Sequence, residues 1–118
     1  MKSYKELIVW QKSYRLSLLI YKATEVFPKE EVFGLVSQMR RSSVSIPSNI
    51  AEGNMRFSSK EHVHFLRIAY GSCAELETQI LLSKDLNFLK EKEYTEVIHL
   101  LEEVMKMISV LLKRFTKN

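Results

Sequence analysis

The stretch from Gly34 to Arg56, GLVSQMRRSSVSIPSNIAEGNMR, places the strongest constraint on the fold of this chain. One stripe of residues recurs through it at the spacing of a buried helix face: Leu35, Met39, Ser42, Ile46, Asn49 and Gly53. Pro47 lies in the middle, and a proline inside a helix removes a backbone hydrogen bond and costs ~3 kcal/mol or more. Two shorter helices would avoid that cost. Because the stripe keeps its phase across the proline, we favour one long helix that is kinked at Pro47.

The same stripe carries two polar side chains, Ser42 and Asn49. A buried polar group without a partner costs ~1–3 kcal/mol. We therefore predict a buried polar network between this helix and the next, in which Arg41 or Asn49 pairs with a buried Glu75. A network that fixes the register of the helices is favoured over a functional site. Its predicted members are Arg41, Ser42, Asn49, Glu52, Glu75 and Gln79.

The remaining sequence also has helical periodicity, and no segment alternates like a strand. We expect helices over about residues 3–26, 29–56, 58–84 and 91–115, with capping boxes at Ser3 and Ser58. The predicted fold is all-α: an antiparallel up-down-up-down four-helix bundle in a single domain, residues 1–118.

Helix one is expected to bury a stripe of large side chains: Leu7, Trp10, Tyr14, Leu18 and Tyr21. In helix three, Gly71 costs ~1 kcal/mol relative to alanine, so we expect it to allow close approach of a neighbouring helix. Helices one, three and four look apolar over more than one face. Exposed patches of this kind usually mark an interface, so a monomer is disfavoured.

Three segments carry a resemblance to a known family: LIVWQKSYRLSLLIYKATEVFPKEEVFGL, QMRRSSVSIPSNIAEG and FLRIAYGSCAELETQ. Over nearly its whole length the chain resembles the 23S rRNA intervening-sequence proteins of bacteria, also called the four-helix-bundle protein family. Proteins of that family are encoded in insertions within ribosomal RNA genes and form ring-like homopentamers. The resemblance thus implies a homopentamer. Accessory proteins of diversity-generating retroelements, a related bundle family, form basic pentamers that bind nucleic acid.

The formal net charge is +4, and residues 1–60 hold ten Lys and Arg against five acids. Cationic stripes can neutralise phosphates, and such binding weakens steeply with salt. Ordinary solvated surface is the alternative for either stripe. One stripe lies on helix one, the other at the start of helix three beside Phe57 and His64, and the candidate nucleic-acid-binding residues are Lys5, Lys12, Arg15, Lys22, Arg56, Lys60 and Arg67. Without a helix-turn-helix signal, binding to RNA or DNA should be weakly sequence-selective.

Other site types are disfavoured. His62 and His64 are two residues apart and His99 is distant, so we expect no metal site, and no cofactor is expected. Cys73 is the single cysteine, which fits a reducing compartment, and its surroundings suggest a small core residue. There is neither a signal-peptide pattern nor an apolar run near the ~18 residues of a membrane span. We expect a cytoplasmic protein that has no catalytic residues.

The sequence therefore predicts a non-enzymatic, oligomeric protein that binds nucleic acid, structured RNA in particular, through basic helical surfaces. The alternative is a structural module that serves another polypeptide, such as a reverse transcriptase, and does not bind nucleic acid itself. A small nuclease or a metal-binding bundle is a third and less favoured hypothesis.

Overall fold

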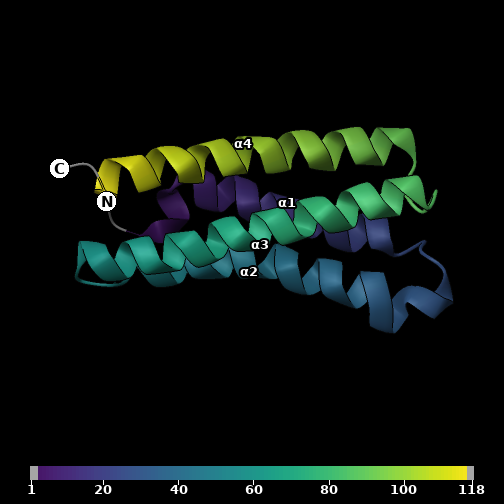
Figure 1. Ribbon diagram of the computed structural model, residues 1–118, viewed down its shortest axis with the longest axis horizontal. Coiled ribbons are helices and arrows are strands. Elements are labelled where there is room, and N and C mark those ends of the chain that lie inside the picture. The colour runs from purple at the N-terminus through teal and green to yellow at the C-terminus, as the bar shows by residue number, and fades with distance from the viewer. Residues whose placement is uncertain (1–2, 117–118) are drawn as a thin grey trace.

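The computed structural model describes residues 3–116, which form four long helices and contain no strand. Figure 1 labels these helices, and their bounds are α1 (Ile8–Thr24), α2 (Ser37–Asn54), α3 (Ser59–Asp85) and α4 (Glu91–Thr116). A 3₁₀ turn (Tyr4–Glu6) precedes α1, and a 3₁₀ turn (Lys29–Glu31) followed by a π-helical turn (Val32–Val36) precedes α2. The all-α class predicted from the sequence is confirmed.

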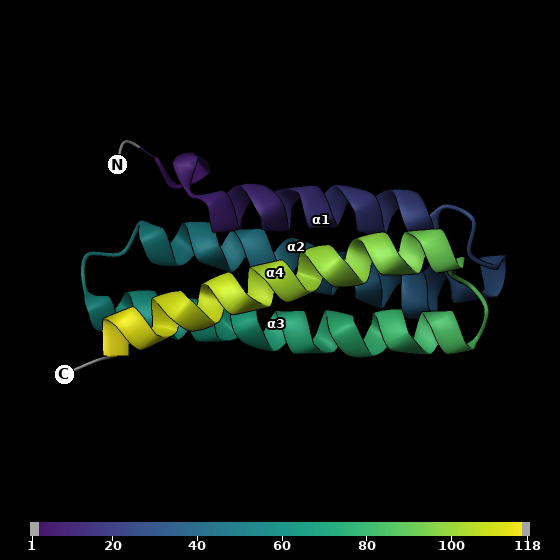
Figure 2. The ribbon, with the colours of Figure 1, turned by 90° about the horizontal axis from the view of Figure 1, so that it is seen from above.

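The helices pack side by side into a rod 46 Å long and 21 Å across. α2 contacts α1 and α3, and α4 contacts α3 and α1, so each helix has two neighbours around the bundle. The α2–α3 connection lies at the same end as the start of α1 and the end of α4 (Figures 1 and 2). This end of the bundle is called the α2–α3 end below. The other two connections lie at the opposite end.

Apolar side chains at helical spacing form the core faces of α3 and α4. α3 buries Leu66, Ala69, Cys73, Leu76 and Ile80. The buried residues of α4 are Val97, Ile98, Leu100, Leu101, Val104 and Ile108. These side chains recur every three or four residues, and their removal from water is the main stabilising contribution to a bundle of this kind.

Helix α1 buries a different face in the core from the one predicted. Tyr14, Leu18 and Tyr21 are 49%, 58% and 43% exposed, so their assignment to the core was wrong. The buried side chains of α1 are smaller on average: Val9, Ser13, Leu16, Ser17, Ile20 and Thr24. Serine side chains leave room for a neighbouring backbone, and Ser17 Oγ donates a hydrogen bond to the carbonyl oxygen of Ser43 on α2, at 2.9 Å. Tyrosines in the same place would hold the two helices apart.

The chain before α2 departs from the predicted continuous helix. Gly34 has φ −111° and ψ −113°, outside the helical region, and α2 begins only at Ser37. The Glu31 carboxylate accepts a hydrogen bond from the Leu35 backbone N–H at 3.2 Å, which satisfies one free donor of this irregular turn. α2 then runs without interruption through Pro47, so a split into two helices there is excluded. The kink at Pro47 remains a prediction.

The two predicted capping boxes have different outcomes. Ser58 accepts a hydrogen bond from the backbone N–H of Glu61 at 3.2 Å and caps α3 as expected. Ser3 is also an N-cap, as predicted, but it caps the 3₁₀ turn Tyr4–Glu6 and accepts from the backbone N–H of Lys5 rather than from that of Glu6. The extended backbone of Leu7 separates the 3₁₀ turn from α1, which is why the first α-helix begins at Ile8.

The close approach expected at Gly71 occurs at another glycine. A Cβ atom at Gly71 would meet no heavy atom of residues 3–116 within 4 Å, so that expectation was wrong. A Cβ atom at Gly53 would lie 3.0 Å from Cβ of Phe65 and 3.2 Å from the carbonyl oxygen of His62. Of the two glycines in α2 and α3, Gly53 is therefore the one at which the two helices pack closely.

Candidate functional site

The predicted pair between α2 and α3 forms, but at the surface. Arg41 donates a hydrogen bond to the Glu75 carboxylate at 2.5 Å, and these side chains are 55% and 47% exposed. The prediction of a buried Glu75 was therefore wrong. Both residues lie at the outer edge of the α2–α3 seam, where the carboxylate is hydrated and needs no buried partner. Exposed ion pairs of this kind contribute little to stability.

The interior of the same seam is held by hydroxyl groups. Ser42 is fully buried and donates to Oε1 of Gln79 at 2.7 Å. Ser45 and Ser72 share a hydrogen bond of 2.7 Å, a contact that the sequence reasoning missed. Their signal was the run of serines in residues 42–48, which falls partly on the buried stripe.

The two other predicted members of this network, Asn49 and Glu52, bond to residues four positions away along the chain. Asn49 donates its side-chain amide to the carbonyl oxygen of Ser45 at 2.8 Å, and so does not reach across to Glu75. Glu52 accepts from Arg56 at 2.7 Å on the surface. Asn49 also donates to Ser45 Oγ at 3.0 Å and so reaches Ser72 of α3 through Ser45. Arg41, Glu52 and Glu75 lie at the surface, outside the buried network.

Two of the seven candidate cations are engaged in ion pairs. Lys12 donates to the Glu103 carboxylate at 2.8 Å, and this hydrogen bond and charge lower the pKa of Glu103. Arg56 pairs with Glu52, and its guanidinium lies 4.8 Å from the centre of the Phe65 ring. The other five make no ion pair within residues 3–116: Lys5, Arg15, Lys22, Lys60 and Arg67.

Lys60 and Arg67 lie on one face of α3 and line a surface pocket of about 370 Å³. The pocket lies between the first turns of α3 and the last turn of α4, and its lining residues are Ser59, Lys60, Val63, His64, Arg67, Phe115 and Thr116. Residues 104–116 of α4 include two lysines and an arginine and no acidic residue. Both helices therefore bring positive charge to the α2–α3 end of the bundle.

The histidines near this end have separate roles. The His62 ring packs against Phe115, with centroids 4.4 Å apart, and burial lowers the pKa of His62, which favours the neutral ring. The exposed His64 meets Phe65 edge-on at 5.1 Å. Among the described residues, no three His, Cys, Asp or Glu side chains are grouped so that they could hold a metal ion.

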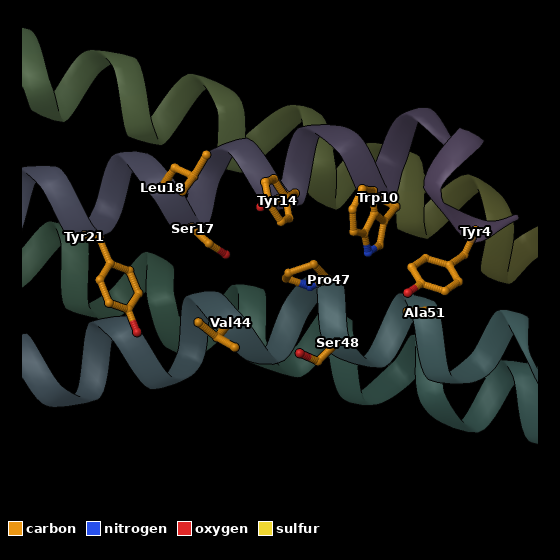
Figure 3. A pocket seen from close by; sticks show the side chains of 10 residues that line it. All are labelled: Tyr4, Trp10, Tyr14, Ser17, Leu18, Tyr21, Val44, Pro47, Ser48 and Ala51. Carbon is orange, nitrogen blue, oxygen red and sulfur yellow. The ribbon is translucent and has the colours of Figure 1, made fainter.

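An apolar groove of about 610 Å³ runs between α1 and α2 (Figure 3). Aromatic side chains from α1 and the preceding 3₁₀ turn form one wall, and α2 supplies the other. The lining residues are Tyr4, Trp10, Tyr14, Ser17, Leu18, Tyr21, Val44, Pro47, Ser48 and Ala51.

The side chains of the groove support one another. Trp10 packs against both Tyr4 and Tyr14, at centroid distances of 5.4 and 5.0 Å. The Arg40 guanidinium lies 4.6 Å from the centre of the Tyr21 ring and donates through Nε to the Thr24 hydroxyl at 3.0 Å. The groove thus presents a largely preformed apolar surface to solvent. The sequence signal for it was the stripe of large side chains on helix one, Trp10, Tyr14, Leu18 and Tyr21, which we had placed in the core.

Cys73 is fully buried in the core of α3. Burial and the charge of Glu77 raise the pKa of its thiol to about 12, so the thiol stays protonated at neutral pH. Because the thiolate is the reactive form of cysteine, Cys73 behaves as a small core residue.

These features define an all-α four-helix bundle with one basic end and one apolar groove. The chain belongs to the 23S rRNA-intervening sequence protein family, whose model matches residues 5–110.

A solved structure from Bacteroides thetaiotaomicron VPI-5482 has the same fold. It is described as a protein of unknown function from the S23 ribosomal protein family, with 24% sequence identity and a TM-score of 0.81. The alignment covers 90% of this chain and 99% of that one. No curated protein gave a significant match. No helix within residues 3–116 is both long and apolar enough to cross a lipid bilayer.

Proposed function

We propose that this protein is a non-enzymatic, self-assembling protein that binds structured RNA through the basic surface at its α2–α3 end. The observation that carries the proposal is the pair Lys60 and Arg67. Both are exposed on one face of α3, neither has an acidic partner within the described chain, and the acid-free end of α4 adjoins them. Membership of a family named for ribosomal RNA supports RNA as the ligand.

The spacing of these cations suits a phosphate backbone. Lys60 and Arg67 are seven residues apart, which at about 1.5 Å per residue separates their Cα atoms by roughly 10 Å along the helix axis. Along the axis of double-stranded DNA, this distance corresponds to about three phosphates of one strand, at ~3.4 Å each. Contacts to phosphates position a protein but carry little sequence information, so we expect weak sequence selectivity.

The test is the affinity for a labelled RNA hairpin across a salt series, with a DNA hairpin of the same stem as a second probe. The wild-type protein should lose affinity steeply as salt rises, because each phosphate contact releases counterions. The double variant Lys60→Ala/Arg67→Ala should weaken binding. It should also reduce the salt slope, the steepness of log affinity plotted against log salt concentration, by about two. The matched control is Lys92→Ala, a cation at the opposite end beside Glu91 and Glu93. If the control weakens binding as much as the double variant, the basic end is not the site.

Self-assembly is the second part of the proposal, with a homopentamer in the cytoplasm as the expected form. The α1–α2 groove supports it, because three of its side chains, Tyr14, Leu18 and Tyr21, are between 43% and 58% exposed. Contiguous exposed apolar surface usually marks a contact with another protein. The occupant that we propose for the groove is a second copy of this chain.

A module that serves another polypeptide and binds no nucleic acid is the alternative function. The groove is the observation that favours it, since the same surface fits a helix of a different protein. Absence of RNA and DNA binding at low salt would select this alternative. We propose no catalytic role, consistent with the protonated thiol of Cys73 and with the separate environments of His62 and His64.

A further inference from the structure

Phe57 lies in the short connection between α2 and α3 and is fully exposed, with a relative exposure of 106%. It directly precedes Ser58, the residue that caps α3. An apolar residue at this position commonly packs against the fourth residue of the helix, which here is His62. The His62 ring instead packs against Phe115 at 4.4 Å, so Phe57 makes no such contact. Its ring is thus available to a ligand.

Two cationic residues flank Phe57 in the sequence. Arg56 is the adjacent residue and also pairs with Glu52, whereas Lys60, the second residue of α3, has no acidic partner among the described residues. The first turn of α3 adds the partial positive charge of a helix N-terminus. An exposed aromatic ring between cations offers a stacking surface for a nucleobase together with contacts for the phosphates on either side.

We infer that Phe57 stacks on an unpaired nucleobase, and that the ligand is RNA with a single-stranded segment, such as the loop of a hairpin. This inference rests on the RNA binding proposed above and adds the class of RNA. In a fully paired helix the bases are stacked on one another, so Phe57 finds no free base face there. Unpaired nucleotides can turn a base outward and place their phosphates near Lys60.

The experiment compares binding of oligouridine with binding of a blunt-ended RNA duplex of the same strand length, by fluorescence anisotropy. Phe57→Ala should weaken oligouridine binding about tenfold, the usual effect of losing one stacking ring. Binding of the duplex should change less than about twofold. Phe57→Tyr keeps the aromatic face and should bind oligouridine like the wild type.

Phe33 provides a matched control, because it is also almost fully exposed (95%) and follows Glu30 and Glu31 in the sequence. It belongs to the turn Val32–Val36, and the α1–α2 connection that contains this turn lies at the opposite end of the bundle (Figure 1). Phe33→Ala should leave both affinities unchanged. Since Phe57→Ala removes no charge, it should also leave the salt slope unchanged, whereas Lys60→Ala should lower that slope by about one.

Three results for Phe57→Ala would overturn this inference and leave the proposed function standing. They are a wild-type affinity for oligouridine, an equal loss of affinity for oligouridine and for the duplex, and a change in the particle size of the variant by light scattering. The last would assign Phe57 to a contact between copies. If the wild-type protein binds neither probe at low salt, the proposed function and this inference both fail.

Discussion

Two helical glycines show how the contacts of a residue decide whether glycine stabilises or destabilises the fold at its position. Gly71 faces open space, whereas Gly53 sits against the backbone of His62 and the Cβ atom of Phe65. Glycine in a helix costs ~1 kcal/mol relative to alanine, unless a close contact requires it. Both positions look alike in the sequence, because each lies inside a helical segment.

We predict that Gly71→Ala raises the free energy of unfolding by ~0.5–1 kcal/mol, through helix propensity alone. Gly53→Ala should lower it by ~1 kcal/mol or more, because overpacking typically costs ~1–3 kcal/mol and the backbone oxygen of His62 cannot easily move away. Urea unfolding followed by circular dichroism measures both changes. Equal stabilisation by the two substitutions would contradict the close packing of α2 on α3 at Gly53.

The buried thiol of Cys73 makes stability depend on alkaline pH. Its pKa is raised from 9.0 to about 12 in the folded protein, so the folded state keeps a proton that the unfolded chain loses. Stability from this group is therefore fully present below pH 9 and decreases as pH rises toward 12, by ~1.4 kcal/mol per pH unit.

Thermal or urea unfolding between pH 8 and pH 11, compared between wild type and Cys73→Ala, isolates this contribution from the titration of lysines and tyrosines. The wild type should lose more stability than the variant as pH rises. Parallel pH profiles would mean that the thiol is accessible to solvent in the folded state.

At the scale of elements, the α2–α3 seam separates a buried hydrogen bond from a surface ion pair. Ser42 and Gln79 bond inside the seam at 2.7 Å, whereas Arg41 and Glu75 pair at its solvent edge. Both contacts are short hydrogen bonds between side chains of α2 and α3. Their energetic contributions differ because only the first loses its water on folding.

We predict that Ser42→Ala lowers the free energy of unfolding by ~1–3 kcal/mol, since it leaves the Gln79 side chain without its partner. Glu75→Gln should change it by less than ~1 kcal/mol, as for other exposed pairs. Chemical denaturation of the two variants under the same conditions provides the measurement. A larger loss for Glu75→Gln than for Ser42→Ala would show that the register of α2 on α3 depends on the ion pair.

At the scale of the whole molecule, the groove and the basic end are separate surfaces. The groove lies along α1 and α2, and the basic pocket lies between α3 and α4. The self-assembly and the RNA binding proposed above therefore use different surfaces of the protein. A ring of such bundles would present several basic ends, and linked sites increase overall affinity without new contacts.

We predict that Leu18→Asp converts the assembled protein to a monomer, because it places a charge in the apolar groove. Light scattering coupled to size-exclusion chromatography gives the particle mass, and far-ultraviolet circular dichroism checks that the helices remain. Val110→Asp is the control, since Val110 is 54% exposed but lies on α4, outside the groove. An unchanged mass for Leu18→Asp would remove the groove from the interface.

The sequence by itself determined the helical class, most of the buried faces of α3 and α4, and the cap at Ser58. Each of these depends on residues within a few positions of one another, where helical periodicity and local hydrogen bonds act. The same reasoning found the cations of the basic end. It did not distinguish Lys60, which has no acidic partner within residues 3–116, from Lys12, which is paired with Glu103 far away in the sequence.

Tertiary structure alone decided which of two apolar stripes of α1 is buried. One stripe contains Tyr14 and Tyr21, the other contains Ser13 and Ser17, and both satisfy the helical period. The serine side chains let α1 approach the backbone of α2 more closely than the tyrosines would. The position of the close glycine contact and the surface location of Glu75 were settled in the same way. In each case the deciding contact joins residues far apart in the chain, and local periodicity contains no information about such contacts.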